Sequence, residues 1–300
     1  ITETPVTIVD VQRPGPATGL PTWTDQGDLR FALHASQGEF MRLIVAPGDM
    51  HECYVGIQVA LNLADKFQIP AILLSDKFLS ESHMICEQFN VDEIVIDRGK
   101  LALNKQAIES GIKFVDENEE YLRYLPTNSG VTLRTVPGVE GGVFLANSDE
   151  HDEKGLTNED ASNRQEQSDK RMLKLSNIER ELPLPVIYGD VNSSILLIGW
   201  GSTKGPILEA LKLLEEDLDT SVAFCHAMYI WPFPKDYLNE LLPKYRKVIL
   251  VENNSLGQFG GLIREMTGFH AHHKWLKYDG RPFWPEELKE KIINVIEMKN

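Results

Sequence analysis

A chain of 300 residues, 42% of them hydrophobic, can bury one large or two ordinary cores. It has no apolar run long enough to cross a membrane, and its formal charge of −15 excludes nucleic acid as an expected partner, because phosphate backbones would be repelled. The isolated cysteines Cys53, Cys86 and Cys225 indicate a reducing, cytoplasmic compartment and predict no disulfide, iron–sulfur cluster or zinc site on this chain. We attribute the acidity to solubility rather than to a basic redox partner.

The first predicted elements are an apolar strand and a stiff loop. Residues 6–11 are predicted to form a buried strand, and residues 22–25 have the Ser/Thr-x-x-acid pattern of a helix start. The loop between them is rich in proline and glycine and contains one arginine, Arg13. Because ligands of open α/β sheets bind beyond the carboxyl ends of strands, we predict that Arg13 binds an anionic substrate. The alternative is a solvated arginine, or one that binds a backbone carbonyl.

The next segment repeats a β-α-β rhythm, which indicates a parallel sheet. We expect a helix near residues 25–35, a strand at 43–46, a long helix after Asp49 and a strand at 71–74. Asp49 and Glu52 form a capping pair for the long helix. Its predicted apolar face contains Cys53, Ile57, Ala60, Leu61, Ala64 and Phe67.

Ser75, Asp76 and Lys77 follow the next strand directly. This group, Asp76 above all, is predicted either to line the same crevice as Arg13 or to cap a helix over residues 78–89. The two interpretations are left open.

The middle of the chain has weaker periodicity, with turn clusters at 126–130 and 137–142. Residues 147–170 are so polar that we expect a solvated or interface loop and the most mobile region of the chain. A metal site at residues 149–153 is disfavoured, because consecutive side chains rarely converge on one ion. A helix over 170–180 is expected to follow.

A second α/β domain is predicted from residue 194. Strands are expected at 195–198, 221–227 and 248–251, with a helix at 207–216. The glycine turn at 199–205 resembles a dinucleotide cradle, but the second strand ends without the acid that would bind ribose. The polar group at 252–254 with Gln258 is interpreted as an interface or a helix cap. The histidines 270, 272 and 273 lack helical metal-ligand spacing, so no metal is expected there.

Several motifs together resemble one enzyme family over nearly the whole chain. The loop QRPGPATGLPT at 12–22, followed by QGDL at 26–29, resembles the substrate loop of the alpha subunit of 2-oxoacid:ferredoxin oxidoreductases, particularly the 2-oxoglutarate type. The same order of motifs continues with GEF (38–40), APGD (46–49), LSDKFLSE (74–81), DEHDEKG (149–155), IGWGSTKG (198–205), ENN (252–254) and GQ (257–258).

The resemblance implies roles for particular residues. In that family the loop arginine pairs with the carboxylate of the 2-oxo acid, and the threonine nine positions later helps to select the acid; these positions are Arg13 and Thr22. Thr18 and Gly19 would line the crevice. Ala17 stands where many members have serine. Thr22 could instead cap the following helix, unless Thr24 does so.

The resemblance also implies the fold and the domains. Residues 1–95 would be the carboxyl-terminal part of a parallel-sheet, pyrimidine-binding domain, 96–189 a connecting region with the acidic loop, and 190–300 a transketolase C-terminal-like α/β domain. The start Ile1-Thr2-Glu3, without methionine, is interpreted as that of a fragment. The part that activates the cofactor would then lie upstream, and the fragment alone would be inactive.

The implied reaction is the oxidative decarboxylation of a 2-oxo acid, 2-oxoglutarate being favoured, to its acyl-CoA with reduction of ferredoxin. Thiamine diphosphate and magnesium would bind at the interface with a beta subunit, an iron–sulfur cluster would lie on a partner, and coenzyme A would be the co-substrate. The alternatives are a beta-type subunit of a 2-oxoacid dehydrogenase and a non-catalytic assembly subunit.

Overall fold

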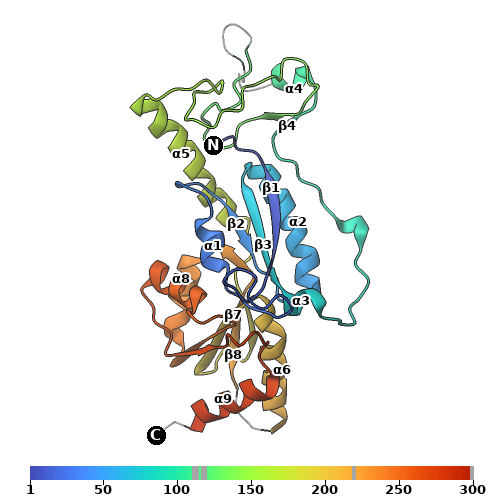
Figure 1. The fold of residues 1–300 in the computed structure, drawn as a ribbon, viewed down its shortest axis with the longest axis vertical. Coiled ribbons are helices and arrows are strands. Elements are labelled where there is room, and N and C mark those ends of the chain that lie inside the picture. Colours follow the sequence, from blue (N-terminus) through green and yellow to red (C-terminus); the bar gives the residue numbers. More distant parts are fainter. Residues whose placement is uncertain (110–114, 116–119, 218–220, 298–300) are drawn as a thin grey trace.

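The computed structural model describes residues 1–109, 115, 120–217 and 221–297. It shows two α/β halves joined by a smaller region, and we call them the first half and the second half in chain order (Figure 1). The strands are β1 (Val6–Gln12), β2 (Leu43–Val45), β3 (Pro70–Asp76), β4 (Leu101–Ala102), β5 (Arg134–Thr135), β6 (Val186–Gly189), β7 (Ile195–Trp200), β8 (Ala223–Ala227), β9 (Tyr229–Trp231), β10 (Lys247–Glu252) and β11 (His273–Leu276). The helices are α1 (Leu29–His34), α2 (Met50–Phe67), α3 (Lys77–Glu81), α4 (Lys105–Glu109), α5 (Ala161–Glu179), α6 (Lys204–Asp217), α7 (Lys235–Leu241), α8 (Gln258–Thr267) and α9 (Pro285–Glu297).

The first sheet has the strand order β1-β3-β2-β9. Strands β1, β3 and β2 are parallel, as the β-α-β rhythm predicted, whereas β9 comes from the second half of the chain and is antiparallel to β2. The sheet is therefore mixed, and it is completed by a segment more than 150 residues away along the chain.

Strand β1 is an edge strand, so the prediction that residues 6–11 are buried is wrong. Within the described residues it pairs only with β3, and Val9 is 54% exposed. Apolar residues at an edge give the same sequence pattern as a central strand, because the pattern does not record the number of neighbours.

Helix α2 forms as its capping signal predicted. The Asp49 side chain accepts a hydrogen bond from the Glu52 backbone N–H at 2.8 Å. The buried face contains Gly56, Ala60, Leu63, Ala64 and Phe67. Leu61, which we placed on that face, is 53% exposed.

Two helices are shorter than predicted. Helix α1 begins at Leu29 rather than near residue 25, because the backbone of residues 24–27 bonds to the second half of the chain instead of to a helix. Helix α3 ends at Glu81 rather than at residue 89.

The prediction of a solvated loop over 147–170 is right for most of residues 147–160 and wrong for the rest. Helix α5 begins at Ala161, and His151 before it is fully buried. Glu150 accepts two hydrogen bonds from Arg171 and one from Arg164. Ion pairs, rather than apolar contacts, thus anchor this polar segment, and a hydrophobicity pattern cannot detect them.

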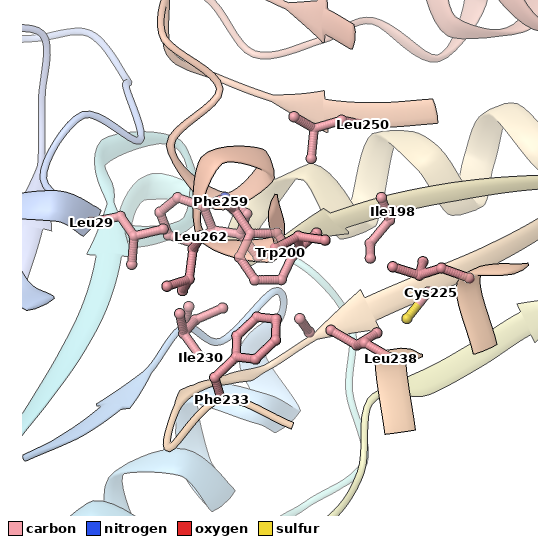
Figure 2. Packing of buried hydrophobic residues seen from close by; sticks show 14 of the residues in the cluster. Leu29, Ile198, Trp200, Cys225, Ile230, Phe233, Leu238, Leu250, Phe259 and Leu262 are labelled. Carbon is pink, nitrogen blue, oxygen red and sulfur yellow. The ribbon is translucent and has the colours of Figure 1, made fainter. Parts of the chain in front are cut away.

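The second sheet has the order β11-β10-β7-β8-β6, with only β6 antiparallel to its neighbour. Helices α6 and α9 pack on one face, and α7 and α8 on the other. The second face shares its core with the first half: Figure 2 shows Leu29 of α1 and Ile230 of β9 beside Trp200 of β7 and Phe259 of α8. The two halves are therefore packed through one continuous hydrophobic cluster.

Among the described helices, none combines the length and apolar character needed to span a membrane.

Candidate functional site

The loop that contains Arg13 runs from β1 to α1, and in Figure 1 it is the dark blue trace between the two sheets, beside α3. Gln12 ties its two ends together. The Gln12 side-chain amide donates to the Ser75 carbonyl and accepts from the Asp28 N–H, each at 3.1 Å, and Gln12 is 1% exposed. The base of the loop is thus fixed to the carboxyl end of β3.

The tip of the loop is closed by its own backbone. The Leu20 N–H donates to the Pro14 carbonyl at 3.0 Å. Gly19 has φ +51°, and a Cβ there would lie 1.8 Å from the Pro14 oxygen. Gly19 is therefore required by the loop itself. Thr18 beside it is exposed.

Arg13 is exposed at the carboxyl end of β1. Its guanidinium forms no hydrogen bond or ion pair with the part of the chain that the structure describes. It does not bind a backbone carbonyl, so a solvated arginine is the alternative that stays open beside substrate binding. A cation on a closed, proline-rich loop is available to an external anion.

Thr22 and Thr24 have different environments. Neither caps α1, whose N-cap residue is Asp28. Thr24 is buried; its hydroxyl donates to Asp76 Oδ1 at 3.0 Å and accepts from the Phe78 N–H. Thr22 lines a cavity of about 280 Å³, and within the described residues its hydroxyl has no hydrogen-bond partner. Thr22 therefore does not act as the cap of the following helix, which was the alternative role for it.

The cavity beside Thr22 is formed by the loop, α3 and a turn of the second half. Its lining residues are Thr22, Trp23, Thr24, Lys77, Phe78, Glu81, Ser82, Gly280 and Pro282. Lys77 forms an ion pair with Glu81, one turn further along α3.

Asp76 caps α3 instead of facing an open crevice. Its carboxylate accepts from the Leu79 N–H at 3.0 Å and from Thr24, and the residue is 1% exposed. Burial raises the pKa of Asp76, while its hydrogen bonds oppose that rise.

Three carboxylates in and beside the loop, those of Asp10, Asp25 and Asp28, have raised pKa values. Burial, reinforced by the charges of Asp28 and Asp76, raises the pKa of Asp25 to about 6, although the Gln26 N–H opposes the shift. Burial also raises the pKa of Asp28, and that of Asp10 together with the charge of Asp28.

The second half of the chain holds the end of the loop through Gln26, which is 1% exposed. Its side chain donates to the Trp200 carbonyl at 2.8 Å and accepts from the Asn253 N–H at 2.9 Å. Its backbone N–H donates to the Asn253 carbonyl, and its carbonyl accepts from Asn254.

The group at 252–254 caps a helix, one of the two predicted roles, and also contacts the first half of the chain. Glu252 accepts from the backbone N–H groups of Phe259 and Gly260 at the start of α8. Asn254 accepts from Gly257 and donates to Gln26. Nearby, the His272 ring accepts from Val248 N–H, and β11 begins at His273.

The glycine turn after β7 is filled by the chain itself. A Cβ on Gly201 would lie 2.8 Å from the Gln26 side-chain nitrogen, and one on Gly48 would lie 2.8 Å from the Gly201 carbonyl oxygen. The turn packs against the first half at Gly201, so this glycine is explained without a dinucleotide.

A buried ion cluster joins the two halves at the start of α2. Lys204 donates to Asp49 and to Glu52, each at 2.5 Å, and His226 lies 2.9 Å from Glu52. Burial raises the pKa of Glu52, but hydrogen bonds and charge from His226 and the Lys204 ammonium outweigh it and hold this pKa at about 2.

Lys77 lines the cavity with Thr22, as one of the two interpretations of residues 75–77 allowed. Sequence reasoning missed the contact of Arg281 with the Trp23 ring. No sequence pattern links residues more than 250 positions apart. In the ranges that the structure describes, no three His, Cys, Asp or Glu side chains gather to hold a metal ion.

Both halves of this chain match known protein families. Residues 1–170 match the family "Pyruvate flavodoxin/ferredoxin oxidoreductase, thiamine diP-bdg", and residues 189–282 match the transketolase C-terminal domain. A 2-oxoacid:ferredoxin oxidoreductase subunit alpha from Saccharolobus solfataricus is 36% identical over 98% of this chain and 45% of its own length. The 2-oxoglutarate synthase subunit KorA of Methanothermobacter marburgensis is 26% identical over 98% of this chain and 75% of its own.

A solved structure has the same fold. The 2-oxoglutarate:ferredoxin oxidoreductase from Magnetococcus marinus, described with 2-oxoglutarate, coenzyme A and succinyl-CoA bound, aligns with a TM-score of 0.88 and 29% identity. The match covers 98% of this chain and 49% of that one, so this chain spans about half the length of that protein and of several of its relatives. The family match, the relatives and the fold agree: this chain belongs to the pyruvate flavodoxin/ferredoxin oxidoreductase family.

Proposed function

We propose that this chain is part of the alpha subunit of an enzyme that oxidatively decarboxylates a 2-oxo acid, 2-oxoglutarate being favoured, to its acyl-CoA with reduction of ferredoxin. One observation carries the assignment to a site: Arg13 has an unpaired guanidinium, within the described residues, on a closed loop at the carboxyl end of the first sheet. The names of the relatives support the reaction class.

Arg13 and Thr22 have separate tasks in this proposal. The planar guanidinium of Arg13 offers two parallel N–H donors to the carboxylate next to the keto group. Thr22 offers a free hydroxyl at the wall of the neighbouring cavity, where it would distinguish one 2-oxo acid from another. Because Gln12 and Gly19 hold the loop closed, the loop loses little conformational entropy when the 2-oxo acid binds.

Thiamine diphosphate and a magnesium ion are proposed to bind where this chain meets a beta subunit. Support for this cofactor comes from the family matched by residues 1–170, which is described as thiamine diphosphate-binding. When bound, thiamine diphosphate supplies the carbanion chemistry of decarboxylation. An iron–sulfur cluster on a partner would carry electrons to ferredoxin, and coenzyme A would accept the acyl group.

The test is an assay of the full-length protein together with its beta subunit. We expect 2-oxoglutarate to drive ferredoxin reduction that requires coenzyme A, with a higher kcat/KM than pyruvate. Electron transfer to lipoamide instead of ferredoxin would indicate a dehydrogenase. An assembled complex that turned over no 2-oxo acid would make this chain an assembly subunit and contradict the proposal.

A further inference from the structure

A turn of the second half, residues 279–282, contacts the loop beside Thr22. The Thr24 N–H donates to the Gly280 carbonyl at 3.1 Å. The Arg281 guanidinium carbon lies 3.0 Å from the centroid of the Trp23 ring. Trp23 is the residue next to Thr22, so the turn holds the chain directly after that threonine.

The fit at this turn is tight. Gly280 has φ +82°, and a Cβ there would lie 2.8 Å from Leu20 Cδ1 and 3.1 Å from Trp23 Cβ. A larger residue would therefore push against two residues of the loop. The same glycine lines the cavity that contains Thr22.

The turn is itself fixed to the second sheet. Asn253, which is 3% exposed at the end of β10, donates its side-chain amide to the Arg281 carbonyl at 2.9 Å. The Arg281 N–H donates to Asp279 at 2.9 Å. Asn253 also bonds to Gln26 through its backbone, so one residue orients both the turn and the end of the loop.

Within the described residues, Arg281 has no carboxylate partner. Its side-chain contacts are the Trp23 ring and the carbonyl of Asp279. A guanidinium over the face of an indole is an attractive arrangement, and tryptophan is the strongest aromatic partner for it. This charge is therefore directed at the loop and not at a surface ion pair.

We propose that Arg281 is a positioning residue that holds Trp23, and through it Thr22, in the conformation that receives the 2-oxo acid. This rests on the proposed function. If the loop adopts the substrate-binding conformation in only a fraction of the molecules, the apparent affinity for substrate is reduced in proportion to that fraction. Saturating substrate draws all molecules into this conformation and restores turnover. Loss of Arg281 should thus raise KM and leave kcat nearly unchanged.

The experiment uses the full-length protein with its beta subunit, assayed with 2-oxoglutarate. Arg281→Ala should raise KM about five- to tenfold with kcat within about twofold of wild type. Arg281→Lys keeps a cation over the ring and should recover part of the loss. Arg246→Ala removes an exposed arginine of the same half and is the matched control. An unchanged KM in Arg281→Ala, or an equal rise in Arg246→Ala, overturns the proposal.

A second measurement separates this inference from the proposed function. Hydrogen exchange of the Trp23 and Thr24 amides needs no turnover, and it should be faster in Arg281→Ala than in wild type or Arg246→Ala. Unchanged exchange at these amides contradicts the contact between turn and loop even when the enzyme is active. If Arg13→Ala leaves kcat/KM unaltered while Arg281→Ala raises KM, the role of Arg13 fails and that of Arg281 stands.

Discussion

Arg13 and Thr22 are loop side chains whose functional groups have no bonding partner in the described part of this chain, while their neighbours are fully engaged. Gln12, Thr24 and Gln26 all direct their polar atoms to the protein itself. Both side chains are exposed, so a ligand from solution can reach them.

Thr22→Ala should change which acid is preferred. Loss of one hydroxyl should alter the ratio of kcat/KM between 2-oxoglutarate and pyruvate by about 1 kcal/mol, the size of a single hydrogen bond. Thr22→Ser keeps the hydroxyl and should keep the ratio. Steady-state kinetics of the full enzyme with both acids provides the measurement, and an unchanged ratio in Thr22→Ala would remove Thr22 from the selection of substrate.

Ionised Asp25 should lower the free energy of unfolding, and this effect should depend on pH. Its pKa is raised to about 6 from 3.8, so between these values the folded state binds more protons and its stability falls as pH rises. Asp25→Asn should stabilise the protein by about 1 kcal/mol at pH 8, after a discount for partial exposure. Thermal unfolding at pH 4 and pH 8 tests this: the same gain at both values would contradict it.

Sequence reasoning found the loop but not all of its contacts. Proline, glycine and arginine after a strand are local features that point to Arg13, whereas the resemblance to the family points to Thr22. Gly19 also closes the loop on Pro14, which the sequence alone did not indicate. The contact of Arg281 with Trp23 is set by tertiary packing, which local patterns do not report.

At the scale of elements, the loop depends on one backbone conformation. Gly19→Ala would place a Cβ 1.8 Å from the Pro14 oxygen, so the hydrogen bond between Leu20 and Pro14 must open. We expect a destabilisation of about 2 kcal/mol or more, together with a higher KM for the 2-oxo acid.

Gly38→Ala is the control for Gly19, because Gly38 has φ +76° and a Cβ added there would meet nothing within 4 Å. It should cost only the conformational penalty, about 1 to 2 kcal/mol, without a change in KM. Thermal unfolding and kinetics of both variants give the comparison. Equal KM values would mean that closure of the loop does not matter for substrate.

Elements with strong local signals were predicted better than elements held by charge. Helix α2 has a capping pair and apolar spacing, and it begins where expected. Helix α5 begins at Ala161, well before the predicted start at residue 170. Within it, buried Lys170 and Lys174 are neutralised by Glu3, which lies more than 160 positions away. Such a charge pairing has no local signature.

The whole molecule is joined by a charged cluster as well as by its shared core. Glu52 holds Lys204 and His226 of the second half, and its pKa is about 2. Because this pKa lies below the ordinary 4.5, Glu52 contributes stability that is fully present above about pH 4.5 and is lost as pH falls toward 2.

Glu52→Gln should therefore destabilise the protein by about 3 kcal/mol at pH 7 and flatten its acid unfolding between pH 4.5 and 2. Glu265→Gln removes the carboxylate of an exposed ion pair with Arg30 and should cost less than about 1 kcal/mol. Unfolding followed by circular dichroism across this pH range measures both. A Glu52→Gln variant as stable as Glu265→Gln would show that the cluster does not hold the halves together.

The membership of both halves in one core also explains why the second half matters for a site on the first. Its strand β9 completes the first sheet, and its residues Asn253 and Gly280 hold the loop. The site on the loop is thus a property of the assembled molecule.

The most direct test of this account is Arg13→Ala in the full-length enzyme with its beta subunit. A guanidinium that pairs with the substrate carboxylate should be worth about 2 to 5 kcal/mol of transition-state stabilisation, seen as a loss of kcat/KM for every 2-oxo acid. Arg13→Lys, which keeps the charge without the planar fork, should recover only part. Equal kcat/KM in wild type and Arg13→Ala, with the complex intact, would show that the loop is structural and contradict the central claim.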